Sequence, residues 1–112
     1  MNALVISTTE DATGVVATIA PWATNLAASL GPDCRLLQGE AVTRTNTAAE
    51  VISADVVCFF GHGVDDAWEA QGTGNPPALD VASVNALAGK AVFAFACRTA
   101  RELGPAAASH GC

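Results

Sequence analysis

The sequence predicts an α/β fold built on a doubly wound, mostly parallel four-stranded sheet. Three observations support this prediction: short apolar runs alternate with segments of helical periodicity, the connections between them are short, and two of the runs are continuously apolar. Strands that alternate with helices in this way pair in parallel through right-handed crossovers. Continuously apolar runs are typical of central strands that are covered on both faces.

The first half of the chain supplies two strands and two helices. Residues 4–7 form a short apolar run that predicts the first strand, and residues 15–30 carry apolar side chains at helical spacing. The Gly31-Pro32 pair ends this helix, because neither residue continues helical backbone well. Residues 34–37 predict a weaker second strand, and residues 41–54 predict a shorter second helix.

The second half of the chain contains the two continuously apolar runs. Residues 56–61 predict the third strand and residues 91–97 predict the fourth, both of them central and buried. Between them lie an acidic, Gly- and Pro-rich loop over residues 64–78 and a short helix over residues 81–87. Residues 100–109 predict the last helix.

Composition limits the partners that this chain can take. It has 112 residues, enough for one domain, with 11 acidic and 5 basic side chains and a net charge of −6. Nucleic acid is not expected as a partner, because phosphate binding requires a basic face and the basic residues are scattered. No run approaches the ~20 apolar residues that span a bilayer, and the N-terminus lacks a basic leader region. We therefore expect a cytoplasmic protein with no membrane partner.

The four cysteines are expected to be free thiols. Disulfides are rare in cytosolic proteins. The cysteines are Cys34, Cys58, Cys97 and Cys112. Their spacing includes no Cys-x-x-Cys pair, so a structural zinc site is not expected.

Two reactive side chains follow the continuously apolar runs. His62 stands in a Gly-His-Gly turn after the third strand, and Cys97 ends the fourth. Parallel sheets place their sites at the carboxyl ends of the strands, so the two side chains meet if these strands are neighbours. A thiol that faces an imidazole can act as a nucleophile with a proton-transfer partner. A helix after Cys97 would favour its thiolate, and the N–H groups of Gly63 and Cys97 could stabilise an oxyanion.

The segments around these two side chains resemble a known family. The Phe-Phe-Gly-His-Gly sequence at residues 59–63 is followed by the run at residues 87–100, which ends in Ala-Cys-Arg-Thr-Ala. This pattern resembles caspase-like cysteine peptidases. It is most similar to the bacterial CHAT domains, in which one hydrophobic run leads into Gly-His-Gly and a later run leads into Ala-Cys. The resemblance covers about residues 50–112, and the earlier elements match only in their order.

The resemblance implies a caspase-like three-layer sandwich that hydrolyses peptide bonds through an acyl-enzyme. Cys97 would be the nucleophile, and His62 would protonate the leaving amine and then activate water. Gly63 and Cys97 would supply the N–H groups of the oxyanion hole. The partner would be a peptide or protein substrate, and no metal or organic cofactor is implied.

Three departures from the family pattern affect what can be transferred. Phe95 occupies the position where relatives that cleave after basic residues often carry an acid, so no cleavage preference transfers. Cys-Arg-Thr-Ala replaces the common Cys-x-Ser-Gly continuation. The strands that complete the family's substrate pocket are missing from the 112 residues. We therefore expect a domain that is truncated at its C-terminus or completed by another segment.

Two alternatives remain open. One is a catalytically inactive domain of the same fold, which would recruit partners or form homo-oligomers through exposed sheet edges. The other is a flavodoxin-like domain, because residues 7–14 faintly resemble a phosphate-binding loop.

Several other side chains have weaker predicted roles. Asp65 and Asp66, just after the Gly-His-Gly turn, could form an acidic substrate-binding rim, although a solvated loop is the simpler interpretation. Trp68 in the same loop could line a substrate pocket or cover the sheet edge. Trp22, on the apolar face of the first helix, and Cys58, within the third strand, are expected in the core.

Overall fold

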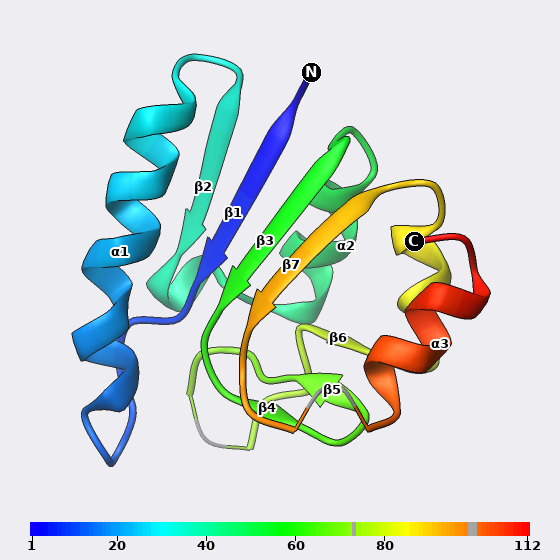
Figure 1. Ribbon diagram of the computed structural model, residues 1–112. Coiled ribbons are helices and arrows are strands. Elements are labelled where there is room, and N and C mark those ends of the chain that lie inside the picture. The colour runs from blue at the N-terminus through cyan, green and yellow to red at the C-terminus, as the bar shows by residue number, and fades with distance from the viewer. Residues whose placement is uncertain (73, 99–100) are drawn as a thin grey trace.

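Four parallel strands form the centre of the computed structural model, which describes residues 1–72, 74–98 and 101–112. Their order across the sheet is β2-β1-β3-β7 (Figure 1). The strands are β1 (Ala3–Ser7), β2 (Cys34–Gln38), β3 (Val56–Phe60) and β7 (Ala91–Phe95). Each of the pairings between them is parallel. The predicted α/β class and four-stranded parallel sheet are therefore confirmed.

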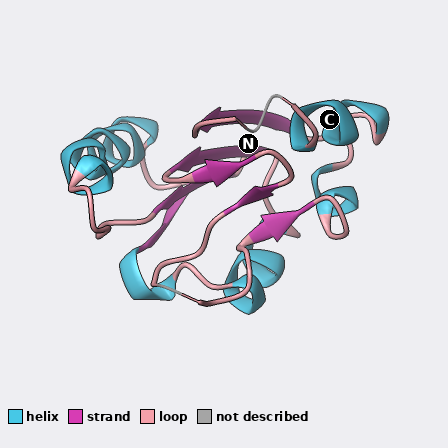
Figure 2. Ribbon diagram, turned by 90° about the horizontal axis from the view of Figure 1, so that it is seen from below, coloured by secondary structure: helices cyan, strands magenta, loops and turns pink. Residues whose placement is uncertain are grey.

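Helices lie on both sides of this sheet (Figure 2). On one face, α1 (Val15–Leu30) packs its Ile19 against Cys58 and Phe60 of β3. The opposite face is covered by α2 (Arg44–Val51), the 3₁₀ helix η2 (Val84–Leu87), α3 (Leu103–Ser109) and a small antiparallel sheet of β4 (Gly63–Val64), β5 (Ala67–Trp68) and β6 (Leu79–Asp80). A second 3₁₀ helix, η1 (Gly39–Ala41), precedes α2. None of the described helices has both the length and the apolar character needed to cross a membrane.

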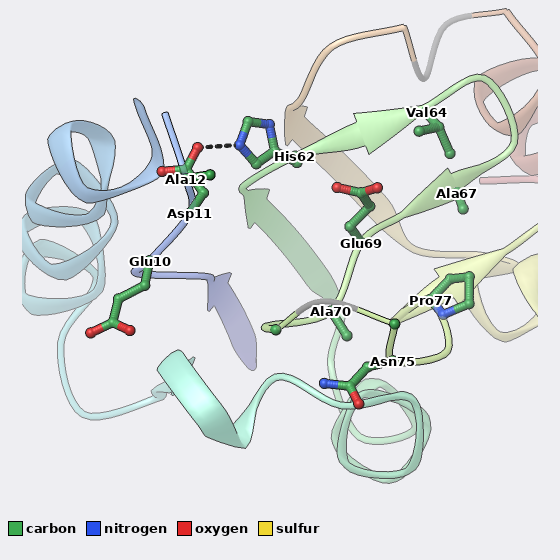
Figure 3. A pocket seen from close by; sticks show the side chains of 12 residues that line it. Glu10, Asp11, Ala12, His62, Val64, Ala67, Glu69, Ala70, Asn75 and Pro77 are labelled. Carbon is green, nitrogen blue, oxygen red and sulfur yellow. Dashed lines mark hydrogen bonds and ion pairs between the residues drawn. The ribbon is translucent and has the colours of Figure 1, made fainter. Parts of the chain in front are cut away.

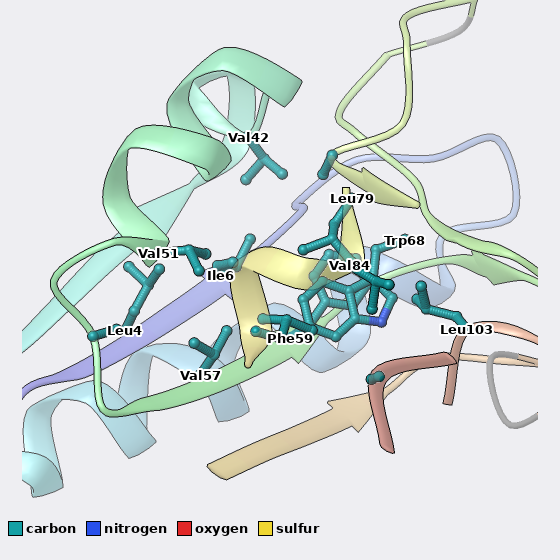
Figure 4. Packing of buried hydrophobic residues seen from close by; sticks show 14 residues of the cluster. Leu4, Ile6, Val42, Val51, Val57, Phe59, Trp68, Leu79, Val84 and Leu103 are labelled. Carbon is teal, nitrogen blue, oxygen red and sulfur yellow. The ribbon is translucent and has the colours of Figure 1, made fainter. Parts of the chain in front are cut away.

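The larger apolar cluster lies between the sheet and this second layer (Figure 4). Phe59 of β3 stacks on Trp68 of β5, with ring centroids 4.7 Å apart and planes inclined by 2°. Both side chains are almost fully buried. Because successive side chains of a strand point to opposite faces, Ile6 and Phe59 reach this cluster whereas Cys58 and Phe60 face α1. The predicted core position of Cys58 is confirmed.

Three helical segments differ from their predicted boundaries. α2 is shorter than residues 41–54, because the Thr43 hydroxyl accepts a backbone hydrogen bond and caps the helix there. The helix predicted over residues 81–87 is a single 3₁₀ turn, η2. The last helix begins at Leu103, and its predicted start at residue 100 lies outside the described residues.

The two tryptophans differ in burial, and only the prediction for Trp22 is wrong. The segment predicted as a loop over residues 64–78 contains β5, which joins β4 and β6 in the small sheet. Trp68 is consequently 2% exposed. Trp22, predicted in the core, is 53% exposed, so that prediction is wrong. Its ring meets Phe95 of β7 edge to face, with centroids 5.7 Å apart.

β7 is an edge strand, which corrects the prediction of a fourth strand buried on both faces. In the part of the chain that the structure describes, β7 pairs with β3 alone. Its Phe93 and Phe95 side chains are 53% and 45% exposed. The apolar character of this run therefore correctly predicts a strand but not a buried one.

Candidate active site

His62 and Cys97 follow the carboxyl ends of two adjacent parallel strands. Phe60 of β3 pairs with Phe95 of β7, and each candidate residue stands two positions later. The N–H of Gly61 donates to the Phe95 carbonyl at 3.2 Å, so the contact between the two segments continues past the strand ends. The two strands are therefore neighbours, as predicted, and the backbone brings residues 62 and 97 to the same edge of the sheet.

The side chains of His62 and Cys97 are not hydrogen-bonded to each other. Cys97 is exposed, and no hydrogen bond between described residues joins its thiol to the imidazole. His62 is paired instead with Asp11 from the loop after β1. Nε2 of the imidazole lies 2.5 Å from Oδ2 of the carboxylate (Figure 3). The side chain of His62 is 37% exposed, whereas that of Asp11 is 10% exposed.

Two hydrogen bonds hold Asp11 in its charged form. The Thr13 hydroxyl donates to Oδ2, and this bond, followed by the bond from His62, lowers the pKa of the Asp11 carboxyl. An ionised carboxylate can only accept hydrogen bonds, so the proton between the two residues belongs to Nε2 of His62. Nδ1 of the neutral ring then has a free lone pair and is the nitrogen that can accept a proton.

Sequence reasoning missed Asp11. It lies 51 positions before His62, whereas the acidic residues considered as site residues were those that follow the histidine. One signal could have found it: Asp11 lies in the loop after the first strand of a parallel sheet, and that loop opens at the same edge as the loop after the third strand.

Gly61 is required by close packing at the end of β3. A Cβ at this position would lie 2.6 Å from Oγ1 of Thr8 and 2.8 Å from the Phe59 ring. Thr8 is held in place because its N–H donates to the Phe60 carbonyl at 3.1 Å. A side chain at position 61 would therefore displace the start of the loop that carries Asp11.

The backbone N–H of Gly63 is directed away from its hairpin partner. The N–H of Glu69 donates to the His62 carbonyl at 2.9 Å, which makes these two residues a hydrogen-bonded pair of the β4–β5 hairpin. The next pair, Gly63 with Trp68, is then of the non-hydrogen-bonded kind, because the two kinds alternate in antiparallel strands. The Gly63 N–H is thus left out of the ladder, and its oxyanion role stays a prediction.

Asp65 ties the turn between β4 and β5 to the segment after Cys97. Its carboxylate pairs with Nε of Arg98 at 3.1 Å and with Nη1 of Arg101 at 3.9 Å. Its carbonyl accepts two backbone N–H groups at the start of α3. Arg98 has a φ of 66°, a left-handed conformation that residues other than glycine rarely adopt. Asp65 therefore braces this backbone, and its carboxylate is engaged with arginine rather than available as a free rim charge.

Of the other predicted site features, some lie where they were expected and others do not. Asp66 is exposed, as expected of a rim residue or of a solvated loop. Trp68 belongs to the core through its stack on Phe59, so it is not positioned to contact a substrate. α3 begins six positions after Cys97 and does not present its N-terminus directly after the thiol. The Thr-Ala end of the cysteine motif, residues 99–100, lies outside the described residues.

A cavity of about 340 Å³ opens beside His62 (Figure 3). Three carboxylates line it, from Glu10, Asp11 and Glu69, whereas Cys97 is not among its described lining residues. The cavity is thus acidic and adjoins the imidazole, but it is distinct from the surface that carries the thiol. Within residues 1–72, 74–98 and 101–112, no three His, Cys, Asp or Glu side chains gather as metal ligands would.

Comparisons of this chain with models of protein families, with curated proteins and with solved structures find no match. The case for a function therefore depends on the chemistry of its own residues.

Proposed function

We propose that this chain is a caspase-like cysteine peptidase domain, in which Cys97 is the nucleophile and His62 transfers protons. The observation that supports this most strongly is the in-register pairing of β3 with β7, because it brings the two motif ends to one edge of the sheet. The hydrogen bond from His62 to Asp11 adds support, because it leaves Nδ1 able to accept a proton.

The proposed reaction has two stages. In the first, the Cys97 thiol gives its proton to Nδ1 of His62 and its sulfur bonds to the scissile carbonyl carbon. The N–H groups of Gly63 and Cys97 hold the oxyanion, and the proton passes from Nδ1 to the amine as the C–N bond breaks. In the second stage, water gives a proton to Nδ1 and its oxygen bonds to the thioester carbon. The C–S bond then breaks, the acid is released, and Cys97 recovers its proton.

The geometry of the free chain is compatible with this proposal. Catalytic hydrogen bonds are often long or misaligned in the absence of substrate and tighten when it binds. The exposed Cys97 side chain has room to rotate, and the backbone contact between Gly61 and Phe95 keeps the two segments together. The caspase-like sandwich itself is part of the proposal, and the parallel order of β1, β3 and β7 is compatible with it.

The test compares two cysteine variants with a mixture of unstructured peptides as substrate. Cys97 and Cys112 are both exposed, so Cys112→Ala is the matched control for Cys97→Ala. We expect Cys97→Ala to lose at least about 100-fold in hydrolysis and Cys112→Ala to retain the wild-type rate, with unchanged far-ultraviolet circular dichroism in both. Equal hydrolysis by Cys97→Ala and the wild type would overturn the proposal.

A non-catalytic interaction module is the second candidate function, and the edge of β7 favours it. Phe93 and Phe95 are exposed, Phe95 in contact with Trp22, and β7 has no second strand partner in the described part of the chain. An unpaired apolar edge is a ready template for another strand, and a second copy of this chain offers a matching edge. Sedimentation equilibrium tests this: a dimer that Phe93→Glu disrupts supports the module, and a monomer at every concentration contradicts it.

A further inference from the structure

Asp11 is a partly buried acid at the candidate site that makes and breaks no bond in the proposed reaction. Its side chain is 10% exposed, and Oδ2 is shared by the Thr13 hydroxyl and Nε2 of His62. The neighbouring Glu10 is exposed. The buried Oδ1 accepts no hydrogen bond from the described residues, so the carboxylate is held through Oδ2 alone.

The order of the strands places His62 between an acid and a thiol. β3 lies between β1 and β7 in the sheet. Asp11 follows β1, His62 follows β3 and Cys97 follows β7. Because parallel strands end at the same edge, the acid, the imidazole and the thiol come in this order along it.

The two ring nitrogens of His62 therefore have different neighbours. Nε2 is directed to Asp11, on the β1 side of the ring (Figure 3). Nδ1 is on another side of the same ring and is not bound to the carboxylate. A hydrogen bond made by one imidazole nitrogen decides which nitrogen carries the proton and also restricts rotation of the ring.

We propose that Asp11 is a positioning residue that keeps the proton of neutral His62 on Nε2 and leaves Nδ1 to exchange protons with Cys97. The second half of this statement rests on the proposed function. When the Cys97 proton moves to Nδ1, the ring becomes an imidazolium whose positive charge is stabilised by the Asp11 carboxylate. The Nε2 proton stays on nitrogen, and Asp11 takes up no proton.

Nitrogen-15 NMR of the histidine side chains tests the first half directly. The chain has 2 histidines, and the exposed His110 serves as an internal reference. At alkaline pH, a neutral His62 ring that donates to Asp11 should show an Nε2 proton that exchanges slowly with water. We expect this resonance to vanish in Asp11→Ala and to remain in Glu10→Gln, which removes a neighbouring charge. Asp11→Asn should shift part of the proton to Nδ1, because an amide can donate to Nε2.

Alkylation of Cys97 by iodoacetamide tests the second half, with Cys34, Cys58 and Cys112 replaced by alanine. In this reaction the sulfur bonds to the methylene carbon, iodide leaves, and the thiol proton goes to Nδ1. We expect Asp11→Ala to slow labelling at pH about 7 by about tenfold, as much as His62→Ala, since the thiolate supply is what changes. The double variant should be no slower than His62→Ala alone. Asp11→Glu should restore part of the rate, and Glu10→Gln should leave it unchanged.

The outcomes separate this proposal from the proposed function. If Asp11→Ala folds normally by circular dichroism but leaves the Nε2 resonance of His62 unchanged, the positioning role is wrong. A different result is that the resonance depends on Asp11, while the rate of Cys97 labelling is unchanged in both His62→Ala and Asp11→Ala. In that case Asp11 does determine which nitrogen of His62 carries the proton, and the proposed Cys97–His62 function is wrong. Loss of both the resonance and the labelling rate supports both proposals.

Discussion

β3 and β7 are neighbouring strands with almost the same apolar composition and very different surroundings. Val-Val-Cys-Phe-Phe in β3 lies in register with Ala-Val-Phe-Ala-Phe in β7. β3 has a strand on each side and a packed layer on each face, whereas β7 pairs with β3 alone in the described residues and exposes two phenylalanines. An apolar run therefore predicts extended backbone, but its burial depends on neighbours that the run itself does not encode.

The largest contrast is expected between phenylalanines of the two strands. Phe59 is fully buried and stacked on Trp68, so Phe59→Ala should lower the free energy of unfolding by about 3–5 kcal/mol. Phe93 is 53% exposed, and Phe93→Ala should cost less than about 1 kcal/mol. Urea denaturation of both variants measures the difference. Similar losses in the two variants would show that β7 is covered in solution.

The reactivities of two thiols, Cys58 within β3 and Cys97 just after β7, compare the surroundings of these strands without any change to the core. Burial, with a smaller contribution from nearby Cys34, raises the pKa of the Cys58 thiol, and its side chain is reachable only when the structure opens. Cys97 is exposed. We expect iodoacetamide to label Cys97 at least about 100-fold faster than Cys58 in the native chain. Peptide mass spectrometry follows each site, and the ratio should collapse in denaturing urea.

The residues directly after the two strands differ in the space that is available for a side chain. Gly61, after β3, has no room for a Cβ beside Thr8 and Phe59, whereas Ala96, after β7, already carries one. Gly61→Ala should therefore cost about 1–3 kcal/mol of stability through overpacking. Adding Thr8→Ala should recover part of that loss, because it removes the nearest clashing atom. Additive losses in a denaturation cycle would contradict this explanation.

The smallest expected contrast in stability is between Asp11, which contacts the segment after β3, and Asp65, which contacts the segment after β7. Hydrogen bonds from Thr13 and then His62 lower the pKa of the Asp11 carboxyl. Its stabilising contribution is thus present above the unfolded carboxyl value of about 3.9 and is lost as the pH falls through the lower folded value. Asp11→Asn should accordingly be less stable than the wild type at pH about 7, and the two proteins should converge in acid.

Asp65→Asn is the matched control for this prediction. Asp65 pairs with Arg98 and Arg101, whose side chains are largely exposed, and such pairs contribute roughly 0–1 kcal/mol. Thermal unfolding across the acid range compares the two variants. An equally small effect of both substitutions at neutral pH would show that the Asp11–His62 contact does not secure the end of β3.

The sequence identified the two segments of the candidate site because each is a local pattern. His62 and Cys97 stand directly after apolar runs, and the parallel sheet that brings those runs together follows from the alternation of strands and helices. Asp11 could not be predicted in the same way. Its partner lies 51 positions away, and no periodicity marks a contact between two loops.

The sequence by itself determined the α/β class, the four strands of the parallel sheet and the residues at their carboxyl ends, because backbone conformation follows from side-chain period and turn residues. Only the tertiary structure decided which apolar residues are buried: Trp68 lies in the core, whereas Trp22 lies outside it. It also decided that His62 pairs with Asp11 rather than with the acids that follow it. Burial and side-chain pairing depend on which surfaces meet, and that is a property of the packed layers rather than of any one segment.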